Sequence, residues 1–443
     1  MTPKHTNAKQ NKEIKSIRQK LDAIPCEKHA KESKFQKRKA QKIDGKTLLL
    51  AFLVMALQGN NSFLLWAVNV NFITGERVSK QAIWKRITSC FTQFLKAVLS
   101  DAFKQQVGCD HNKIMKGVVK LNAYKRILIQ DSTVIALPDW LCWCFPGCTA
   151  QGIRRSQLKI QVVFDLKSNT FIHFEITPYT ANDQSKAEDI LTIAKKGDLI
   201  IRDLGYFDLK CFNKMNENTI QYVSRLKSGV KIYDPTTGKE INLLKVLRKR
   251  GTFDGWVLLG VKGKVKVRLV IQKLPEEQAN LRRHKAKTDR NRRLNHSKDY
   301  YELLGYGIYI TSMEDREISA TEVIKIYGFR WRIESIFKCW KSQFNLQKLI
   351  PKGCPLTKDR AETIIYMMLI FILLFQVTIY NYMNSQIKNK DSRILSLSKL
   401  CNYIANNLTL FLQNNLRALA DDTLYYCCYD KRINRLNFIQ KIA

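Results

Sequence analysis

Hydrophobic and polar positions follow three successive patterns along the chain. Residues 46–108 show helical spacing, in apolar runs at Lys46–Leu57 and Ser62–Asn69 and in a third helix over residues 79–103, for which Ser79 is a suitable N-cap. From residue 125 onward, short β-branched runs indicate strands, and beyond residue 320 helical spacing returns. The pattern predicts an α/β protein with helical regions on either side of a sheet-containing core.

Two of the predicted strands end at an acidic residue. Arg126–Gln130 directly precedes Asp131, and Asp198–Arg202 directly precedes Asp203. The elements predicted between them are a hairpin of strands Leu158–Leu166 and Thr170–Thr177 with the turn Lys167-Ser168-Asn169, and a helix over Ser185–Lys196.

Strand-end carboxylates can meet at the rim of a sheet. Two carboxylates a few ångströms apart repel each other unless a cation neutralises them. Oxygen ligands favour Mg²⁺, and two such ions form the clamp that activates and stabilises oxygens in phosphoryl transfer. Asp131 and Asp203 are therefore candidate metal ligands, and the alternative is that each is an ordinary turn residue.

Residues 217–312 are mostly β in pattern. The basic segment Arg282–Lys298 is predicted as a loop, either solvated or facing DNA phosphates. The strands predicted around it are Gln221–Leu226, Gly255–Val261, Val265–Leu274 and Leu304–Ile310.

Charge indicates the class of partner. The 443 residues include 75 Lys and Arg against 38 Asp and Glu, a net charge of +37. So large an excess opposes compactness through self-repulsion, and a polyanion such as nucleic acid removes that cost. Residues 1–45 carry evenly spread basic residues and are predicted to form a solvated arm, with contact to DNA phosphates as the alternative.

Two features suggest other classes of protein. Cys142, Cys144 and Cys148 are closely spaced, but the spacing is not that of a known zinc finger, so reduced thiols in the cytosol are the preferred interpretation. Ile364–Phe375 is apolar on all sides and approaches a membrane span in length when extended through Tyr380. A buried core helix is the preferred interpretation, and no membrane partner is expected.

A helix predicted over residues 320–344 carries an unusual stripe. At about 100° per residue, Tyr327, Arg330, Glu334 and Lys341 fall within roughly 60° of one another. An acid, two cations and a phenol on one face suit a surface that binds a metal and grips phosphates. The alternative is an exposed helix with a salt-bridge ladder, of which Arg330 and Glu334 would be one pair.

This pattern resembles a known family. Tyr327-x2-Arg330-x3-Glu334-x6-Lys341 is similar to the signature of bacterial insertion-sequence transposases of the DDE superfamily. Asp131-Ser-Thr resembles the first acidic motif of that family, and Asp203-Leu-Gly-Tyr resembles the second. The resemblance extends from residue 46 to about residue 350.

The resemblance implies an RNase H-like catalytic core that a β-rich insertion interrupts, with a helical N-terminal DNA-binding region and a helical C-terminal region. The implied organisation is a basic arm (1–45), a helical DNA-binding domain (46–120), the first part of the core (121–216), the insertion (217–312), the second part of the core (313–357) and a helical region that could serve dimerisation (358–443).

The resemblance also implies an activity. Asp131, Asp203 and Glu334 would bind two Mg²⁺ ions, which Mn²⁺ can replace, and Tyr327, Arg330 and Lys341 would hold the DNA. The enzyme would act in the bacterial cytoplasm at the nucleoid, as a homodimer on double-stranded DNA. It would bind the terminal inverted repeats of its element, cleave at the ends and join the 3′-OH groups to target DNA.

Further residues are candidates for DNA contact. Polar residues at the start of the helix after Ser79 suit a recognition helix, although a plain helical bundle has the same pattern. Trp256 is a candidate for stacking on an unpaired base, or else a core residue. The recognition-helix candidates are Lys80, Gln81, Lys85 and Arg86.

Two other functions remain open. A DNA-binding protein that has lost catalysis would share most of these features, although all three acids are present. An RNase H-like nuclease that cuts without joining would share them as well. The first is distinguished by metal-dependent nicking at the inverted repeats, and the second by a strand-transfer assay.

Overall fold

The structure is a computed structural model. It describes residues 17–38, 43–57, 62–106, 108, 119–150, 152–289, 296–314, 318–346, 348, 350, 357–386, 394–407, 410–411 and 416–429. It is a mixed α/β protein of two compact units. Unit 1 comprises Met1–His111, Ser132–Thr180 and Arg332–Asn437, and unit 2 comprises Asn112–Asp131, Ala181–Trp331 and Phe438–Ala443.

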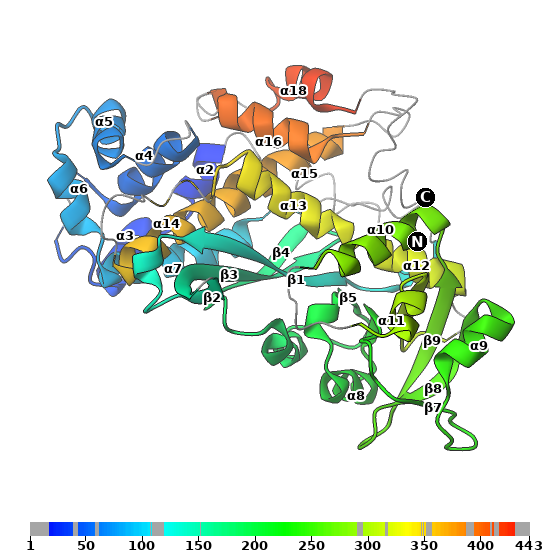
Figure 1. Cartoon of the computed structure of the whole chain (residues 1–443). Coiled ribbons are helices and arrows are strands. Elements are labelled where there is room, and N and C mark those ends of the chain that lie inside the picture. Colours follow the sequence, from blue (N-terminus) through cyan, green and yellow to red (C-terminus); the bar gives the residue numbers. More distant parts are fainter. Residues whose placement is uncertain are drawn as a thin grey trace. The chain divides into compact units, whose positions relative to one another are not determined.

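Unit 1 begins with short helices that pack on a longer one (Figure 1). The predicted single helix over residues 79–103 is two helices, because Thr88 caps a new one by accepting a hydrogen bond from the Phe91 amide. Ser79 is an N-cap, as predicted. The helices are α2 (Ile17–Asp22), α3 (Cys26–Glu32), α4 (Gly45–Leu57), α5 (Phe63–Thr74), α6 (Lys80–Arg86) and α7 (Ser89–Gln105).

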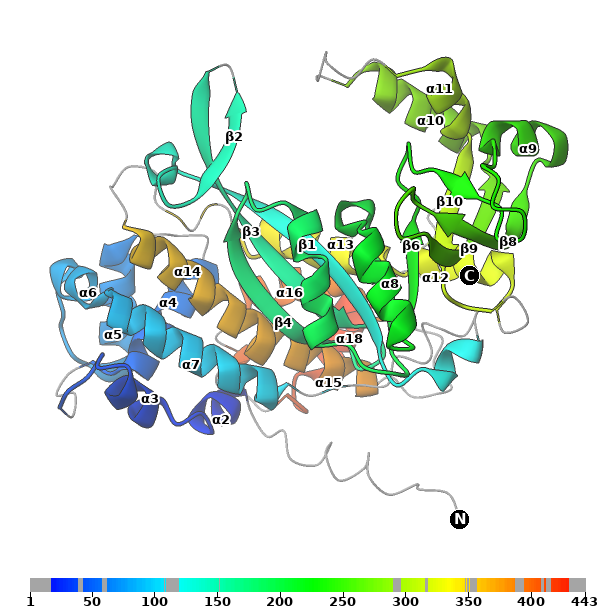
Figure 2. The same cartoon turned by 90° about the horizontal axis from the view of Figure 1, so that it is seen from below.

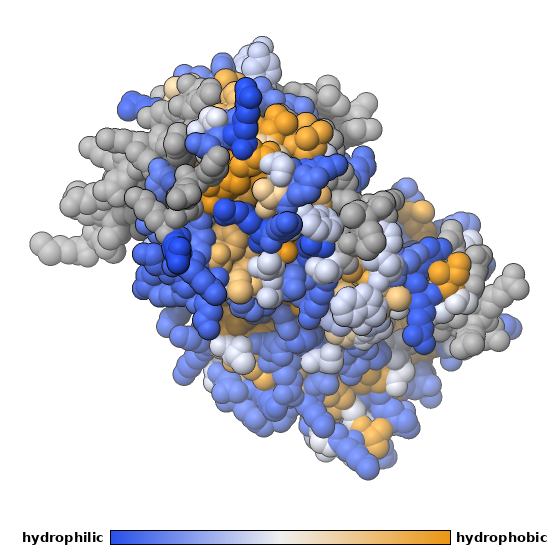
Figure 3. Space-filling view, turned by 90° about the vertical axis from the view of Figure 1, so that its left-hand side faces the viewer, coloured by the Kyte–Doolittle hydropathy of each residue, from blue (hydrophilic) through white to orange (hydrophobic). Residues whose placement is uncertain are grey.

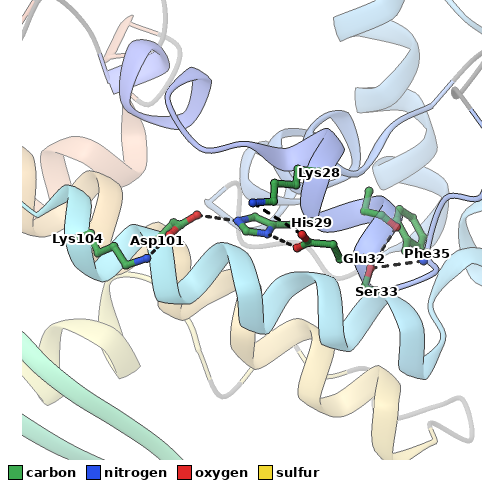
Figure 4. A network of polar contacts seen from close by, with 8 residues as sticks. Lys28, His29, Glu32, Ser33, Phe35, Asp101 and Lys104 are labelled. Atoms are coloured by element: carbon green, nitrogen blue, oxygen red, sulfur yellow. Dashed lines mark hydrogen bonds and ion pairs between the residues drawn. The ribbon is translucent and has the colours of Figure 1, made fainter.

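Helices α2 and α3 lie within the predicted basic arm. His29 Nε2 of α3 lies 2.6 Å from Asp101 Oδ2 of α7, and Lys104 also contacts Asp101 (Figure 4). Hydrogen bonds from Lys104 and His29 lower the pKa of Asp101. Leu21 and Ala30 are buried, so residues 17–38 are not the solvated arm that was predicted. Residues 1–16 and 39–42 of that arm lie outside the described residues.

Helix α5 has an exposed apolar face. Leu64, Val68 and Phe72 follow one another at four-residue spacing and are all exposed. Figure 3 faces the side on which α4, α5 and α6 lie, and hydrophobic side chains gather in the upper part of that view.

The strands of unit 1 form a hairpin and a ribbon. β3 (Ile153–Asp165) pairs antiparallel with β4 (Thr170–Pro178) and with β2 (Pro146–Ala150), and it neighbours β1 (Ile127–Leu137). The predicted hairpin turn is confirmed, with Asn169 in the left-handed region at φ 52°. A short helix, η2 (Asp139–Leu141), precedes β2.

The remaining helices of unit 1 surround a long apolar one. The run Lys358–Gln386 is long and apolar enough to cross a membrane, but 94% of its apolar window is buried inside the protein, as expected for a core helix. Figure 2 shows α14 beside α7, where Thr92 and Thr363 are hydrogen-bonded. The elements are α13 (Trp331–Ser342), α14 (Lys358–Phe371), the π-helical η6 (Ile372–Val377), α15 (Thr378–Gln386), α16 (Leu397–Asn406) and α18 (Ala420–Cys427).

The sheet of unit 2 begins with the first half of β1. β5 (Leu199–Arg202) pairs parallel with β1, and β6 (Gln221–Arg225) pairs parallel with β5. Antiparallel strands then follow in the order β10, β9, β8 and β7. They are β10 (Tyr306–Thr311), β9 (Val265–Lys273), β8 (Phe253–Leu259) and β7 (Ile232–Tyr233).

The helices of unit 2 differ from the predictions at several places, because residues 217–312, predicted to be mostly β, also contain helices over Leu243–Arg250, Glu276–Lys287 and Lys298–Leu303. In place of a helix over Ser185–Lys196 there are two 3-10 helices, η3 (Asp183–Lys186) and η4 (Glu188–Thr192). The predicted basic loop from Arg282 begins inside helix α10, and residues 290–295 lie outside the described residues. The other elements are η1 (Val119–Ala123), η5 (Leu204–Tyr206), α8 (Leu209–Glu217), α9 (Leu243–Arg250), α10 (Glu276–Lys287), α11 (Lys298–Leu303) and α12 (Ala320–Gly328).

Candidate active site

Sheet register brings Asp131 and Asp203 to neighbouring positions in unit 2. The parallel pairing of β1 with β5 ends with Gln130 opposite Arg202, so the next residue on each strand is an aspartate. Asp131 was predicted to end its strand, but β1 continues to Leu137. It is the pairing with β5 that ends at Gln130, and the two carboxylates lie where that pairing stops.

Buried polar contacts hold the two ends of β5. At the start of the strand, Arg126 contacts the buried Asp198 through two hydrogen bonds, of 3.1 and 2.5 Å. At its end, the fully buried Arg202 donates to the Ala187 carbonyl at 2.8 Å. Because a buried charge without partners is costly, these contacts restrict how β5 can shift beside β1. The position of Asp203 depends on them.

Tyr327 contacts Asp203, and Arg330 contacts both aspartates. The Tyr327 hydroxyl donates to Asp203 Oδ1 at 3.1 Å, and Arg330 Nη1 donates to Asp131 Oδ2 at 3.1 Å. Arg330 Nε lies 3.9 Å from Asp203 Oδ1. Burial raises the pKa of Tyr327, so its hydroxyl keeps its proton and acts as a donor. Four of the predicted site residues therefore form one cluster in unit 2.

The helix that was predicted to carry the stripe is broken in the middle. α12 ends at Gly328 and α13 begins at Trp331. Phe329 and Arg330 form a turn whose amides bond to the carbonyls of Ile326 and Tyr327, the tighter bonding common at helix ends. Tyr327 and Arg330 thus meet the aspartates through this turn, and the prediction of one continuous helical face from Tyr327 to Lys341 was wrong.

Glu334 and Lys341 lie on the part of the stripe that remains helical. They are seven residues apart on α13, two turns of one helix face, in unit 1. Both line an open groove of about 540 Å³ between α13 and the second half of β1. Burial lowers the pKa of Lys341. The groove is lined by Ser132, Thr133, Val134, Glu334, Phe337, Lys338, Lys341 and Ser342.

Sequence reasoning missed two residues of unit 1 that bear on this groove. Lys338 lines it one helical turn beyond Glu334, and its i,i+4 spacing from Glu334 was a signal that could have identified it. Arg332 is buried, donates to Asn169 Oδ1 at 3.1 Å and lies 4.9 Å from the Tyr380 ring centre. It anchors the start of α13, and no signal in the sequence distinguished it from the cations that face solvent.

The other predicted DNA contacts lie elsewhere. Lys80, Gln81 and Lys85 are exposed on α6. Arg86 of the same helix donates to the Ile43 carbonyl at 2.7 Å, and burial lowers its pKa, so its side chain also holds α6 in place. Trp256 lies on β8, with the ammonium of Lys266 5.1 Å from its ring centre.

The two neighbouring aspartates carry oxygen ligands of the kind that a divalent metal takes. Mg²⁺ takes oxygen ligands, commonly one or two carboxylates together with water. Asp131 and Asp203 supply such a pair at one edge of β1 and β5. Across the described ranges, no group of three or more His, Cys, Asp or Glu side chains is placed to hold a metal ion.

Comparison with known proteins assigns the family. The model of the family described as "Transposase DDE domain" matches residues 123–373. This range includes six of the residues predicted as a site: Asp131, Asp203, Tyr327, Arg330, Glu334 and Lys341. The chain belongs to this family. It is an insertion-sequence transposase of the DDE superfamily.

Relatives extend the similarity over most of the chain. The transposase for insertion sequence element IS231D of Bacillus thuringiensis subsp. finitimus is 28% identical over 417 residues, 89% of this chain and 85% of the relative. The transposase for IS1151 of Clostridium perfringens is 25% identical over 413 residues, 88% of this chain and 85% of the relative.

A solved structure is also similar. It is the piggyBac transposase synaptic complex with hairpin DNA, with a TM-score of 0.46, 12% identity and coverage of 97% of this chain and 88% of the other. The family assignment does not depend on this likeness.

Proposed function

We propose that this transposase binds the terminal inverted repeats of its element, cleaves the DNA at the ends and joins the 3′-OH ends to target DNA. The observation that carries the proposal is the pairing register that ends with Asp131 beside Asp203, with Arg330 and Tyr327 in contact with them. Two adjacent carboxylates with a cation and a hydroxyl donor suit a phosphodiester held next to a divalent metal.

Asp131, Asp203 and Glu334 are the proposed metal ligands. Two bound Mg²⁺ ions, or Mn²⁺ in their place, would supply activation of the attacking oxygen and stabilisation of the leaving one. Arg330 and Lys341 hold the phosphodiester by charge, and Tyr327 holds Asp203 in place through its hydroxyl. These roles are supported by the cluster in unit 2 and by the groove in unit 1, where Glu334 and Lys341 share one helix face.

The proposed catalytic core is RNase H-like. Its support is the central position of β1, which neighbours β3 on one side and pairs parallel with β5 on the other, with the first two acids on β1 and after β5. The antiparallel strands β7, β8 and β9 would belong to the insertion between Asp203 and Glu334.

DNA recognition is proposed for α6, and the active form is proposed to be a homodimer on DNA. Lys80, Gln81 and Lys85 are exposed at one helix, which suits contact with base edges and phosphates of the terminal repeats. The net charge of +37 suits two DNA partners, the element ends and the target. The enzyme would act at the bacterial nucleoid, and residues 358–443 are the proposed dimerisation region.

The test uses duplexes that end in the inverted repeats of the element, incubated with the full chain and Mg²⁺ or Mn²⁺. We expect cleavage at the repeat end and, with a target plasmid, joined products. Cleavage without joining would identify a nuclease, and repeat binding without cleavage in either metal would identify a catalytically silent DNA-binding protein. The control is a duplex of equal length with a scrambled repeat.

Trp256 is retained as a proposed stacking residue for an unpaired base at the DNA end. Stacking on an aromatic side chain contributes about 1–3 kcal/mol per base. A 2-aminopurine at the DNA end should become more fluorescent with the wild type and lose that signal with Trp256→Ala. An unchanged signal in the variant would assign Trp256 to packing with Lys266 alone.

A further inference from the structure

A two-stranded ribbon extends from the sheet of unit 1 (Figure 2). The pairing of β3 with β4 begins at Leu158, and the register of β3 with β2 covers residues 153–156. Thr149 lies opposite Arg154 and Ala150 lies opposite Ile153, so the pairing of the two strands extends to these positions. Gly152 has a φ of +76° with open space around it, as a tight hairpin turn requires.

The base of the ribbon is held by buried contacts. Ser156 is 1% exposed, its amide donates to Asp139 Oδ1 at 3.2 Å and its hydroxyl donates to the Phe145 carbonyl at 3.0 Å. A Cβ added at Gly147 would lie 2.7 Å from the Arg155 carbonyl, so the two strands approach closely there. The ribbon is therefore a positioned element with a stiff base.

The tip of the ribbon combines apolar and basic side chains. Ile153 is 51% exposed, and Arg154 and Arg155 beside it are exposed as well. Arg155 is paired with Asp139 at 2.8 Å, which keeps its guanidinium along the ribbon. Two further large side chains are exposed nearby. Trp140 lies in the short helix η2, which packs against β3, and Trp143 follows that helix. The apolar side chain of Ile153, beside a cation, has no partner to cover it in this unit among the described residues.

The reach of the ribbon matches a DNA groove. A strand advances about 3.3 Å per residue, so Ile153 lies roughly 10 Å beyond the buried Ser156. The grooves of B-DNA are about 7.5–8.5 Å deep. Architectural proteins insert apolar side chains between base steps from the minor groove, with cations on the neighbouring phosphates. Ile153 and Arg154 have the residue types and the reach for this contact.

We propose that this ribbon, Pro146–Ala150 with residues 152–156, inserts into the groove of the target duplex and bends it, with Ile153 as a wedge at a base step and Arg154 on the adjacent phosphate. An isoleucine at a base step and an arginine on a phosphate respond to deformability, and neither contact reads the donor and acceptor pattern of a base pair. The ribbon therefore suits a duplex of variable sequence, which is the target, whereas the fixed terminal repeats call for the polar side chains of α6. This inference rests on the proposed joining of ends to a target.

The test compares Ile153→Ala/Arg154→Ala with the matched control Val261→Ala/Lys262→Ala, an exposed apolar and basic pair at the β8–β9 turn. Pre-cleaved repeat ends are joined to an intact target duplex and to the same duplex with a two-base mismatch, which bends at low cost. We expect the ribbon variant to lose at least about tenfold in joining to the intact target and to recover most of it on the mismatched one. End cleavage should match the wild type.

The outcomes separate this inference from the proposed function. If the wild-type protein cleaves ends but joins none to either target, the proposed joining is contradicted. The ribbon can still be tested without metal, by measuring the bending of the target duplex through energy transfer between dyes at its two ends. The ribbon assignment is overturned if the variant joins both targets like the control, if the mismatch restores nothing, or if the variant bends the target as the wild type does. Loss of end cleavage in the ribbon variant would assign the ribbon to the element end and so overturn the target assignment.

Discussion

In unit 2, the carboxylates of Asp131 and Asp203 already contact Arg330 and Tyr327, whereas in unit 1 Glu334 shares an open groove with Lys338 and Lys341. The first region is an acidic pair balanced by an internal guanidinium, so an incoming metal must compete with that cation. The second is a groove lined by two lysines beside the glutamate, so an incoming phosphate meets positive charge there. Ligands therefore arrive at the two regions under different electrostatic conditions.

The largest expected effect concerns the three acids. Asp131→Ala, Asp203→Ala and Glu334→Ala should each bring cleavage below detection while binding to terminal-repeat DNA stays within twofold of the wild type, about 0.4 kcal/mol. The measurements are a gel assay of end cleavage and a metal-free binding titration. Glu240→Ala, an exposed carboxylate paired with Lys231, is the control. Near-normal cleavage by one of the three variants would remove that acid from the site.

The next largest effects are expected for one cation from each region, Arg330 in unit 2 and Lys341 in unit 1. Losing one charge-assisted phosphate contact costs about 1.5–3 kcal/mol, so Arg330→Ala and Lys341→Ala should each slow cleavage by roughly ten- to a hundredfold. Of these two cations, Arg330 is the one that lies beside the aspartates in unit 2, 3.1 Å from Asp131 and 3.9 Å from Asp203. Arg330→Ala should therefore lower the Mg²⁺ concentration at half-maximal rate, and Lys341→Ala should leave it unchanged. An equal metal dependence in both variants would mean that the guanidinium does not compete with the metal.

A variant of Lys338 tests whether DNA binds in the groove of unit 1. Lys338→Ala should reduce the slope of log affinity against log salt by about one, because one phosphate contact is lost. The measurement is a binding titration between about 50 and 200 mM salt. Lys37→Ala, an exposed lysine elsewhere in unit 1, should change the slope less. Equal slopes for the two variants would place the DNA outside this groove.

The smallest expected effect is a pH shift at Lys341. Burial lowers the pKa of this lysine below its ordinary value of 10.5, so it loses its proton at a lower pH than an exposed lysine does. The rate kcat/KM should decline on the alkaline side earlier in the wild type than in Lys341→Arg, because arginine keeps its charge. A few-fold difference on the alkaline side is expected, about 1 kcal/mol. Superimposable pH profiles would show that the charge of Lys341 does not limit the rate.

Local features of the structure were predictable from the sequence. The cap at Ser79 and the hairpin turn at Lys167–Asn169 are set by side chains near them in the chain, and both are present. The shared face of Glu334 and Lys341 follows from helix periodicity over two turns. The two strands before Asp131 and Asp203 could also be recognised, since each is a short β-branched run.

Non-local features could not be predicted in the same way. The interruption at Phe329 and Arg330 turns the side chain of Arg330 to the aspartates, whereas helical periodicity alone predicts one unbroken helix. The 3-10 helices over Asp183–Thr192 replace a predicted α-helix, because the buried Arg202 takes up the Ala187 carbonyl that lies between them. In both cases a contact from a distant part of the chain overrides the local preference.

By itself, the sequence determined which residues are available for chemistry: two aspartates after apolar runs, a Tyr-Arg-Glu-Lys spacing and a strongly basic chain. These follow from composition and from local periodicity, which depend on neighbours along the chain. Only the tertiary structure decided that Gln130 lies opposite Arg202, that Arg330 reaches both aspartates and that Arg332 is buried against Asn169. The physical reason is that strand register and burial depend on contacts between segments far apart in sequence, whose side-chain packing no local pattern encodes.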